Sequence, residues 1–464
     1  MIEAGMDVAR LNFSHGTHDE HARRLKTIRQ LGNKAGKPIG IIADLQGPKI
    51  RTGELAGAPL YLRKGEPLVI TTRKIKGRDG AISSTYGRLH NDVKAGDRIL
   101  LDDGSMEVTV LKVRGRDIHC RVIYGGGLGA HKGINLPGIK ISAPSLTRKD
   151  MDDLRFAAEL GVDYFAMSFV RRPEDIIRPK RLLKKLKADI PVIAKIEKPE
   201  ALENIDDIIS VADGIMIARG DLGVEMSPEK VPQIQKDLIT RCNDEGKPVI
   251  TATQMLESMI GQPTPTRAEA SDVVNAIYDG TGAVMLSGET AIGDYPVQAV
   301  RMMARIADEA DTHLKRQKKI FRRSRPIDNF EDAIGQATET AARYLPTRLI
   351  VCFTTSGFTA QQVSSYRPEV PIIAATHNGA ILPRMSLHWG VETILVRKAD
   401  TIDSMIANVE RELLKRRLVR KGENIIITAG YPLGEPGTTN IMQLICIRDR
   451  DVSVPAGRDA GKRG

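Results

Sequence analysis

The sequence predicts an α/β protein built on a (β/α)8 barrel, with a small β-barrel lid domain inserted in it and a C-terminal α/β domain after it. Three observations lead to this fold. Short apolar runs alternate with amphipathic segments, as parallel strands alternate with helices. Most of the polar residues that end these runs are 24 to 34 positions apart, close to the roughly 31 residues per unit of such a barrel. Two stretches, residues 51–133 and 326–464, depart from this pattern.

The predicted barrel strands are apolar runs that end in polar or charged residues. Amphipathic segments such as 148–159 and 230–243 separate them and predict helices. Seven runs can be counted where a closed barrel needs eight, so we expect two open sheet edges. The seven runs are residues 8–13, 39–45, 162–169, 192–197, 215–219, 249–254 and 283–288.

The departures from the barrel pattern predict two further domains. Residues 51–133 are rich in glycine and in short Val/Ile/Leu runs, with a turn signal at 102–104, which indicates a small all-β domain. An insertion at the C-terminal face of a barrel would form a lid over the site. Residues 326–464 alternate strand-like and helical stretches and predict an open α/β sheet. The barrel itself then consists of residues 1–50 and 134–325.

Charged residues stand where two of the predicted strands end. Lys195 and Glu197 close one apolar run, and Arg219 and Asp221 close the next. Residues two apart on a strand point to the same face, so Lys195 and Glu197 project together. The carboxyl ends of parallel strands meet at one edge of a sheet, which brings Asp221 to the same place.

Two carboxylates beside a lysine indicate a site for a divalent cation and an anionic substrate. Hard oxygen ligands favour Mg²⁺ or Mn²⁺. A structural Lys–Glu ion pair at the rim of the barrel explains either motif alone equally well.

Composition narrows the class of protein. The net charge is +11, which suits phosphorylated metabolites as well as nucleic acid. Aromatic residues make up only 4%, so we expect no nucleic-acid partner. The four cysteines are too far apart in sequence for a metal knuckle or a redox pair, and reduced thiols fit a cytoplasmic protein. No apolar stretch is long enough for a membrane span, and we expect no membrane partner.

Nine motifs occur along the chain in a fixed order. They are residues 12–16 (NFSHG), 47–53 (GPKIRTG), 132–138 (KGINLPG), 168–171 (SFVR), 195–197 (KIE), 218–225 (ARGDLGVE), 250–259 (ITATQMLESM), 265–269 (PTRAE) and 285–290 (MLSGET). In this order, with a β insertion between the second and third, the chain resembles pyruvate kinase over nearly its full length.

The resemblance implies transfer of the phosphoryl group of phosphoenolpyruvate to ADP, in glycolysis, by an allosteric homotetramer that uses Mg²⁺ or Mn²⁺. Lys195 matches the lysine at the transferring phosphoryl group, and Arg10 matches an arginine that contacts phosphate. Thr253 matches the residue near the enol carbon, which gains a proton. These three are the expected catalytic residues, and Glu197 and Asp221 match the metal ligands.

The resemblance also assigns binding positions. The backbone at Gly220, next to Asp221, would lie open to the substrate carboxylate and complete the substrate site. A loop in the C-terminal domain resembles the effector-phosphate loop of the family, although an ordinary helix N-cap explains it equally well. It contains Thr354, Thr355, Ser356 and Thr359 and carries no basic residue, so the effector cannot be read from it. The expected nucleotide-phosphate residues are Asn12, His15, Arg51 and Lys132.

One loop differs from potassium-dependent members of the family. They have threonine at the position of Leu45 and glutamate at the position of Lys49. An ammonium group at Lys49 can supply the positive charge that bound potassium would give. The other residues of this monovalent-cation region are Asn12, Ser14 and Asp44. We therefore expect no potassium requirement.

The start of the chain also departs from the family. Members have an earlier barrel strand, whereas residues 1–5 already correspond to the end of the first helix. We expect a true start upstream of Met1 rather than a shortened protein, and lower stability for the chain as given.

Other functions remain open at this point. They are a magnesium-dependent barrel lyase, an inactive homologue that acts as a scaffold, and a nucleic-acid-binding protein.

Overall fold

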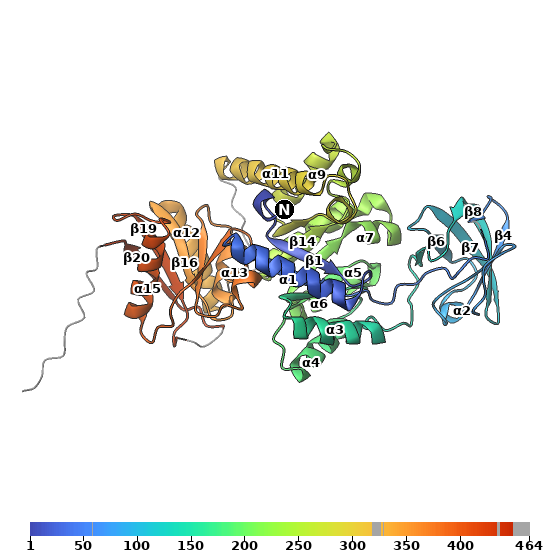
Figure 1. The fold of residues 1–464 in the computed structure, drawn as a ribbon, viewed down its shortest axis with the longest axis horizontal. Coiled ribbons are helices and arrows are strands. Elements are labelled where there is room, and N and C mark those ends of the chain that lie inside the picture. Colours follow the sequence, from blue (N-terminus) through green and yellow to red (C-terminus); the bar gives the residue numbers. More distant parts are fainter. Residues whose placement is uncertain (58, 318–325, 328, 434–436, 449–464) are drawn as a thin grey trace, which may run out of the picture. The chain divides into compact units, whose positions relative to one another are not determined.

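The computed structural model describes residues 1–448 except 58, 318–325, 328 and 434–436. The chain divides into two compact units. The first contains Met1–Arg325 and Ser386–Trp389, and the second contains Pro326–Met385 and Gly390–Gly464. Each unit is built around its own β-sheet, and the first carries the lid as an additional sheet (Figure 1).

The main sheet of the first unit has seven strands, all parallel, in the order β1-β2-β11-β12-β13-β14-β15. Strands that follow one another in the barrel part of the sequence are neighbours, so the sheet curls as a barrel does. β1 and β15 form its two edges: within the described part of the chain, β1 pairs only with β2, and β15 pairs only with β14. The strands are β1 (Val8–Asn12), β2 (Gly40–Asp44), β11 (Tyr164–Met167), β12 (Val192–Ile196), β13 (Gly214–Ala218), β14 (Val249–Ala252) and β15 (Ala283–Met285).

Helices connect these strands, as the alternating pattern predicts. Three of them begin with a capping box in which a threonine and an acidic residue satisfy each other's backbone N–H groups: Thr17 with Glu20, Thr147 with Asp150, and Thr266 with Glu269. The longer helices are α1 (His18–Lys34), α3 (Arg148–Leu160), α4 (Glu174–Lys185), α8 (Val231–Asp244), α9 (Arg267–Asp279) and α11 (Pro296–Arg316). The shorter ones are η1 (Ile2–Ala4), α5 (Pro199–Glu203), α6 (Ile205–Val211), α7 (Arg219–Glu225), η2 (Pro228–Lys230), η3 (Glu257–Ile260) and α10 (Gly288–Ala291).

Both faces of the seven-stranded sheet are buried. Ile41 and Ala194 belong to the core between the sheet and the helices, whereas Ile42 and Ile193 belong to a separate interior cluster. Neighbouring residues of one strand therefore face opposite sides, as the pleat requires. Leu387, from the segment Ser386–Trp389 of the same unit, joins the interior cluster.

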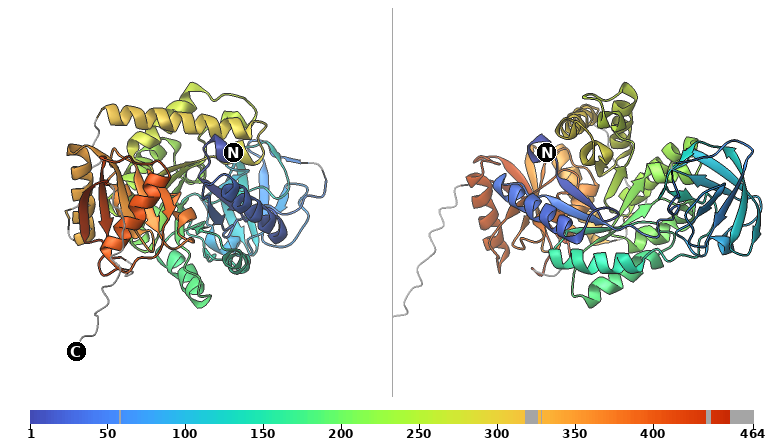
Figure 2. Two further views of the ribbon diagram at one scale, coloured as in Figure 1. Left: turned by 60° about the vertical axis from the view of Figure 1, so that its left-hand side comes forward. Right: turned by 45° about the vertical axis from the view of Figure 1, so that its right-hand side comes forward.

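The lid, drawn in light blue to teal in Figure 2, is a mainly antiparallel sheet. Its six strands have the order β10-β6-β7-β8-β4-β5. Asp102, Asp103 and Gly104 have positive φ angles and form the expected turn between β6 and β7. Arg51 and Gly133 form an isolated antiparallel β-bridge, which brings the two ends of the insertion together. The lid elements are β4 (Pro67–Thr71), β5 (Ala81–Ser83), α2 (Leu89–Asp92), β6 (Arg98–Leu101), β7 (Met106–Arg114), β8 (Asp117–Tyr124) and β10 (Ile134–Asn135), with the separate pair β3 (Leu60–Tyr61) and β9 (Gly127–Leu128).

The second unit is an open sheet in the order β18-β17-β16-β19-β20, with only β20 antiparallel. Two hydrophobic clusters lie on its two faces; one includes Ile406 and Val409, and the other Ala342 and Val363. The predicted α/β domain with helices on both faces is thus confirmed. Its elements are α12 (Phe330–Tyr344), β16 (Thr347–Phe353), α13 (Phe358–Ser365), β17 (Ile372–Thr376), α14 (Leu382–Met385), β18 (Val391–Leu395), α15 (Ile402–Lys415), β19 (Asn424–Ala429) and β20 (Ile441–Cys446).

Candidate active site

The charged residues at the strand ends meet around Lys195. Lys195 lies two residues after Ile193 on β12, so both side chains are on the interior face of the sheet. Ile193 belongs to the interior apolar cluster, and Lys195 marks the change to polar side chains. The Lys195 Nζ atom lies 3.2 Å from Asp44 Oδ1 and 2.8 Å from Glu197 Oε1, and it donates to Ser168 Oγ at 2.7 Å. Arg10 Nε lies 2.6 Å from the other oxygen of Asp44. Four neighbouring strands therefore contribute to one charged group.

The charges in this group support one another. Burial by itself would lower the pKa of Lys195, but the Asp44 and Glu197 carboxylates overcome burial and raise it above its ordinary value. Burial would likewise raise the pKa of Asp44, whereas Lys195 and Arg10 hold it below its ordinary value. Lys195 is thus a buried ammonium that stays charged, ready to face an anion.

The two predicted metal ligands lie at the ends of β12 and β13. Glu197 is buried, and its Oε2 atom accepts a hydrogen bond from the backbone N–H of Phe169 at 2.9 Å. Asp221 lies in the first turn of α7. Desolvation in the site and the neighbouring Glu197 carboxylate raise the pKa of Asp221 to about 6, although Lys195 and Lys49 oppose the rise. The repulsion between these carboxylates is what a bound cation would relieve.

The donor set fits a divalent cation that also takes oxygens from substrate or water. Among the described residues, no group of three or more His, Cys, Asp and Glu side chains could hold a metal by itself. Glu197 and Asp221 would supply two oxygen ligands and leave the remaining positions open. This is the usual way that proteins hold Mg²⁺.

Thr253 lies in a strained loop beside Gly220. Thr253 and Gln254 both have positive φ angles, of 67° and 54°. The Thr253 Oγ1 atom accepts a hydrogen bond from the Gly220 N–H at 2.8 Å and donates to the Ala252 carbonyl at 2.6 Å. A Cβ atom at Gly220 would meet Thr253 Oγ1 at 3.3 Å, so a side chain there would crowd the threonine.

Arg219 has a structural place next to this site. Its guanidinium donates to the carbonyls of Thr253 and Gln254, each at 2.9 Å, and lies 2.7 Å from Asp272. It is buried and holds the strained loop instead of facing the carboxylates. Position at a strand end therefore does not by itself make a charge part of the site.

A group of basic side chains lies near Arg10. Burial lowers the pKa of His15, and the positive charges of Arg51, Lys49 and Arg10 lower it further. The Arg51 Nε atom is buried and has no hydrogen-bond partner within the described residues. A cluster of this kind suits the phosphates of a nucleotide.

The remaining predicted nucleotide residues are engaged within the protein. Lys132 Nζ lies 3.0 Å from Asp102 Oδ1 in the lid. Asn12 Oδ1 accepts a hydrogen bond from the N–H of Ser14 at 3.1 Å. The structure thus pairs Lys132 with a lid carboxylate and Asn12 with the backbone of Ser14.

The predicted effector loop lies in the second unit, between β16 and α13. Thr354 Oγ1 accepts a hydrogen bond from the Gly357 N–H at 2.7 Å, and Thr359 Oγ1 lies 2.9 Å from Thr439 Oγ1. Both threonines are buried, Thr355 is partly exposed and Ser356 is exposed. The loop therefore has the bonds of an ordinary strand-to-helix turn.

Sequence reasoning did not assign a role to Ser168 or to the pair Lys198 and Glu225. Ser168 accepts a hydrogen bond from Lys195. Its position at the end of an apolar run is the feature of the sequence that could have identified it as a site residue. Lys198 Nζ lies 2.5 Å from Glu225 Oε1, although the two are far apart in the sequence, and no local pattern relates them.

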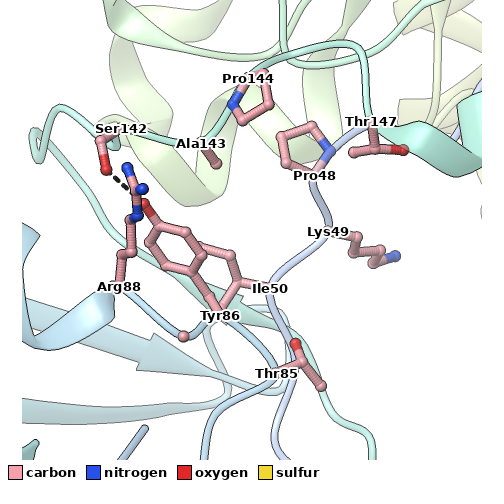
Figure 3. Close-up of a pocket in the computed structure, with 11 residues that line it drawn as sticks. Pro48, Lys49, Ile50, Thr85, Tyr86, Arg88, Ser142, Ala143, Pro144 and Thr147 are labelled. Atoms are coloured by element: carbon pink, nitrogen blue, oxygen red, sulfur yellow. Dashed lines mark hydrogen bonds between the residues drawn. The ribbon is translucent and has the colours of Figure 1, made fainter.

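A cavity of about 440 Å³ lies where the chain passes between the main sheet and the lid. Tyr86 and Arg88 line it from the lid, and Pro48, Lys49 and Ser142 line it from the connecting segments (Figure 3). The Tyr86 hydroxyl donates to Asp92 Oδ2 at 2.5 Å and lies 2.9 Å from Ser142 Oγ. Lys49 also lines the cavity, although its side chain extends away from Tyr86 and Arg88 in Figure 3.

A barrel-type sheet with buried charges at its carboxyl edge and a lid on one of its loops defines a class of enzyme that acts on small anionic substrates. Comparison with known proteins gives the family. Residues 1–300 match the model of the pyruvate kinase barrel domain, and residues 332–445 match that of the pyruvate kinase alpha/beta domain.

Individual relatives agree. The chain is 46% identical to pyruvate kinase of Bacillus licheniformis over 467 residues, which cover 100% of this chain and 79% of the relative. It is 47% identical to that of Geobacillus stearothermophilus over 453 residues, covering 97% and 77%. A crystal structure of a pyruvate kinase from Cryptosporidium parvum superposes with a TM-score of 0.87 at 36% identity, covering 96% of this chain and 92% of that one. The chain belongs to the pyruvate kinase family and is a phosphotransferase.

The fold prediction and the family resemblance are therefore confirmed. In the part of the chain that the structure describes, no helix has the length and apolar character needed to cross a membrane.

Proposed function

We propose that this protein transfers the phosphoryl group of phosphoenolpyruvate to ADP, giving pyruvate and ATP, as a step of glycolysis in the cytoplasm. The observation that carries the proposal is the buried, charged Lys195 held between Asp44, Glu197 and Ser168 at the strand ends. Family membership supports the substrates, and the basic group of His15, Arg51 and Arg10 suits their phosphates.

The proposed reaction breaks the bond between phosphorus and the enol oxygen and forms a bond from phosphorus to an ADP phosphate oxygen. Such a transfer needs positioning and charge neutralisation more than covalent help. Lys195 and Arg10 would bind the phosphoryl oxygens, and the Lys195 charge would stabilise the negative charge as it moves from the donor to the acceptor. Thr253 and Gly220 would lie on the enolate side, where a carbon gains the proton.

The divalent cation would be Mg²⁺, with Mn²⁺ as a substitute, held by Glu197 and Asp221. When bound, it neutralises the charge on substrate and phosphate oxygens. Asn12, Ser14, Asp44 and Lys49 form the monovalent-cation region, in which the Lys49 ammonium would replace potassium. We further propose a homotetramer and an effector loop containing Thr354, Thr355, Ser356 and Thr359, with Lys132 and Asn12 completing the nucleotide site.

The test is pyruvate formation by the purified protein from phosphoenolpyruvate and ADP with Mg²⁺. We expect turnover that falls by roughly 10²–10³-fold or more in Lys195→Ala, because a buried charge aimed at the transferring group is lost. Lys112→Ala, which removes an exposed lysine of the lid, should keep normal turnover.

Two results would contradict the proposal. Consumption of phosphoenolpyruvate without ADP would indicate a lyase, and turnover unchanged by Lys195→Ala would remove the lysine from the reaction.

A further inference from the structure

Lys198 and Glu225 form an ion pair that is buried on both sides. The Lys198 Nζ atom lies 2.5 Å from Glu225 Oε1, and the side chains expose only 8% and 2% of their surface. Desolvation makes such a pair expensive, and replacing it by apolar residues is often neutral or stabilising. Its presence therefore calls for a reason other than stability.

The pair connects the two segments that carry the proposed metal ligands. Lys198 directly follows Glu197 at the end of β12. Glu225 is the last residue of α7, which begins directly after β13 and carries Asp221 in its first turn. Because β12 and β13 are neighbours in the sheet, the ion pair ties the chain after one ligand to the helix that holds the other.

Further contacts restrain both members of the pair. The Lys198 ammonium lies 5.6 Å from the centre of the Phe169 ring, and the Phe169 N–H is the group that holds Glu197 Oε2. Asn135 of β10 in the lid donates to Glu225 Oε1 at 3.2 Å. Glu225 Oε2 is buried and has no hydrogen-bond partner among the described residues. A carboxylate with a purely structural task would normally have both oxygens bonded.

We propose that Lys198 and Glu225 are positioning residues that set the separation of the Glu197 and Asp221 carboxylates, and that Asn135 links this pair to the lid. The inference rests on the proposed function, because the metal site belongs to it. When residues that orient the ligands of a metal site are removed, the affinity of the site for its metal commonly falls by about 10- to 100-fold.

The test is Mn²⁺ binding to the substrate-free protein, followed by electron paramagnetic resonance. We expect Glu225→Gln and Lys198→Met to weaken Mn²⁺ binding by about 10- to 100-fold, with Lys198→Arg recovering part of the loss because it keeps the charge. A double variant, Lys198→Met with Glu225→Met, leaves no unpaired buried charge and should fold, yet it should also bind Mn²⁺ weakly.

A matched control lies at the opposite ends of the same strands. Lys180 Nζ lies 2.7 Å from Asp213 Oδ1, and Asp213 Oδ2 accepts a hydrogen bond from the N–H of Val192, the first residue of β12. Lys180→Met should leave Mn²⁺ binding unchanged. If it weakened binding as much as Lys198→Met, the effect would be general and the positioning role would be wrong.

The outcomes separate this inference from the proposed function. If Glu197→Gln binds Mn²⁺ as the unaltered protein does, the proposed metal site itself is wrong. If Glu197→Gln loses binding while the folded Lys198 and Glu225 variants retain full affinity, the metal site stands and the positioning role is overturned.

Discussion

The charge of Lys49 acts on the active site although its side chain is exposed. The positive charge of Lys49 opposes the rise in the pKa of Asp221 and adds to the lowering of the pKa of His15. Within the described residues it forms no ion pair that would neutralise it. An exposed ammonium without such an ion pair is what the proposed replacement of potassium relies on.

Potassium independence is tested by measuring turnover with and without K⁺ at constant ionic strength. We expect less than about a twofold difference, because the Lys49 ammonium already supplies the charge. A salt such as tetramethylammonium chloride keeps the ionic strength equal in the two samples. A steep rise on adding K⁺ would show that Lys49 does not serve in its place.

At the scale of elements, the loop after β14 is held in an unfavourable backbone conformation by one arginine. Arg219 is the first residue of α7, directly after β13, and donates to two carbonyls of this loop, while Asp272 of α9 neutralises it. Residues of two helices, α7 and α9, thus maintain the positive φ angles of Thr253 and Gln254.

Arg219→Lys should lower kcat by about 10- to 100-fold with a smaller change in KM. Lysine keeps the charge but cannot reach two carbonyls and a carboxylate from one planar group, so Thr253 would lose its fixed position. Steady-state kinetics of the variant would show this. Arg241→Lys, which changes a partly exposed arginine of α8 far from the loop in sequence, is the control. An unchanged kcat in folded Arg219→Lys would contradict the role of the loop.

The sequence could predict those features that depend on neighbouring residues, but not those that depend on contacts between distant segments. The strands of the main sheet end where apolar runs meet polar residues, so Lys195, Glu197 and Asp221 could be placed at one edge from spacing alone. The pairing of Lys198 with Glu225 and the inward turn of Arg219 depend on side-chain packing between distant segments. β20 also escaped prediction, because its exposed and buried residues do not alternate regularly.

At the scale of the whole molecule, the first unit includes a segment from far along the sequence. Ser386 Oγ donates to the Pro38 carbonyl at 2.8 Å, Leu387 enters the interior apolar cluster, and His388 is buried beside them. The fold of the first unit is therefore not complete until more than 380 residues have been synthesised.

Burial of His388 predicts a loss of stability in acid. Burial lowers its pKa to about 4, below the value of about 6.5 in an unfolded chain, so the folded state binds fewer protons. This contribution is fully present above pH 6.5 and is lost as the pH falls from 6.5 to 4, up to about 3 kcal/mol.

The measurement is the urea midpoint of the first unit between pH 7 and 4.5, compared with that of His388→Gln. We expect the unaltered protein to lose more stability on acidification than the variant does. Equal losses would show that His388 titrates normally in the folded protein.

The bridge between Arg51 and Gly133 has a consequence for protein engineering. Since the chain leaves for the lid and returns at adjacent backbone positions, the eighty or so residues between them could be replaced by a short turn without stretching the remaining chain. All of the lid except β10 lies in this replaceable segment. Exchanging this segment between relatives would replace most of the lid and leave the residues at the strand ends of the main sheet unchanged.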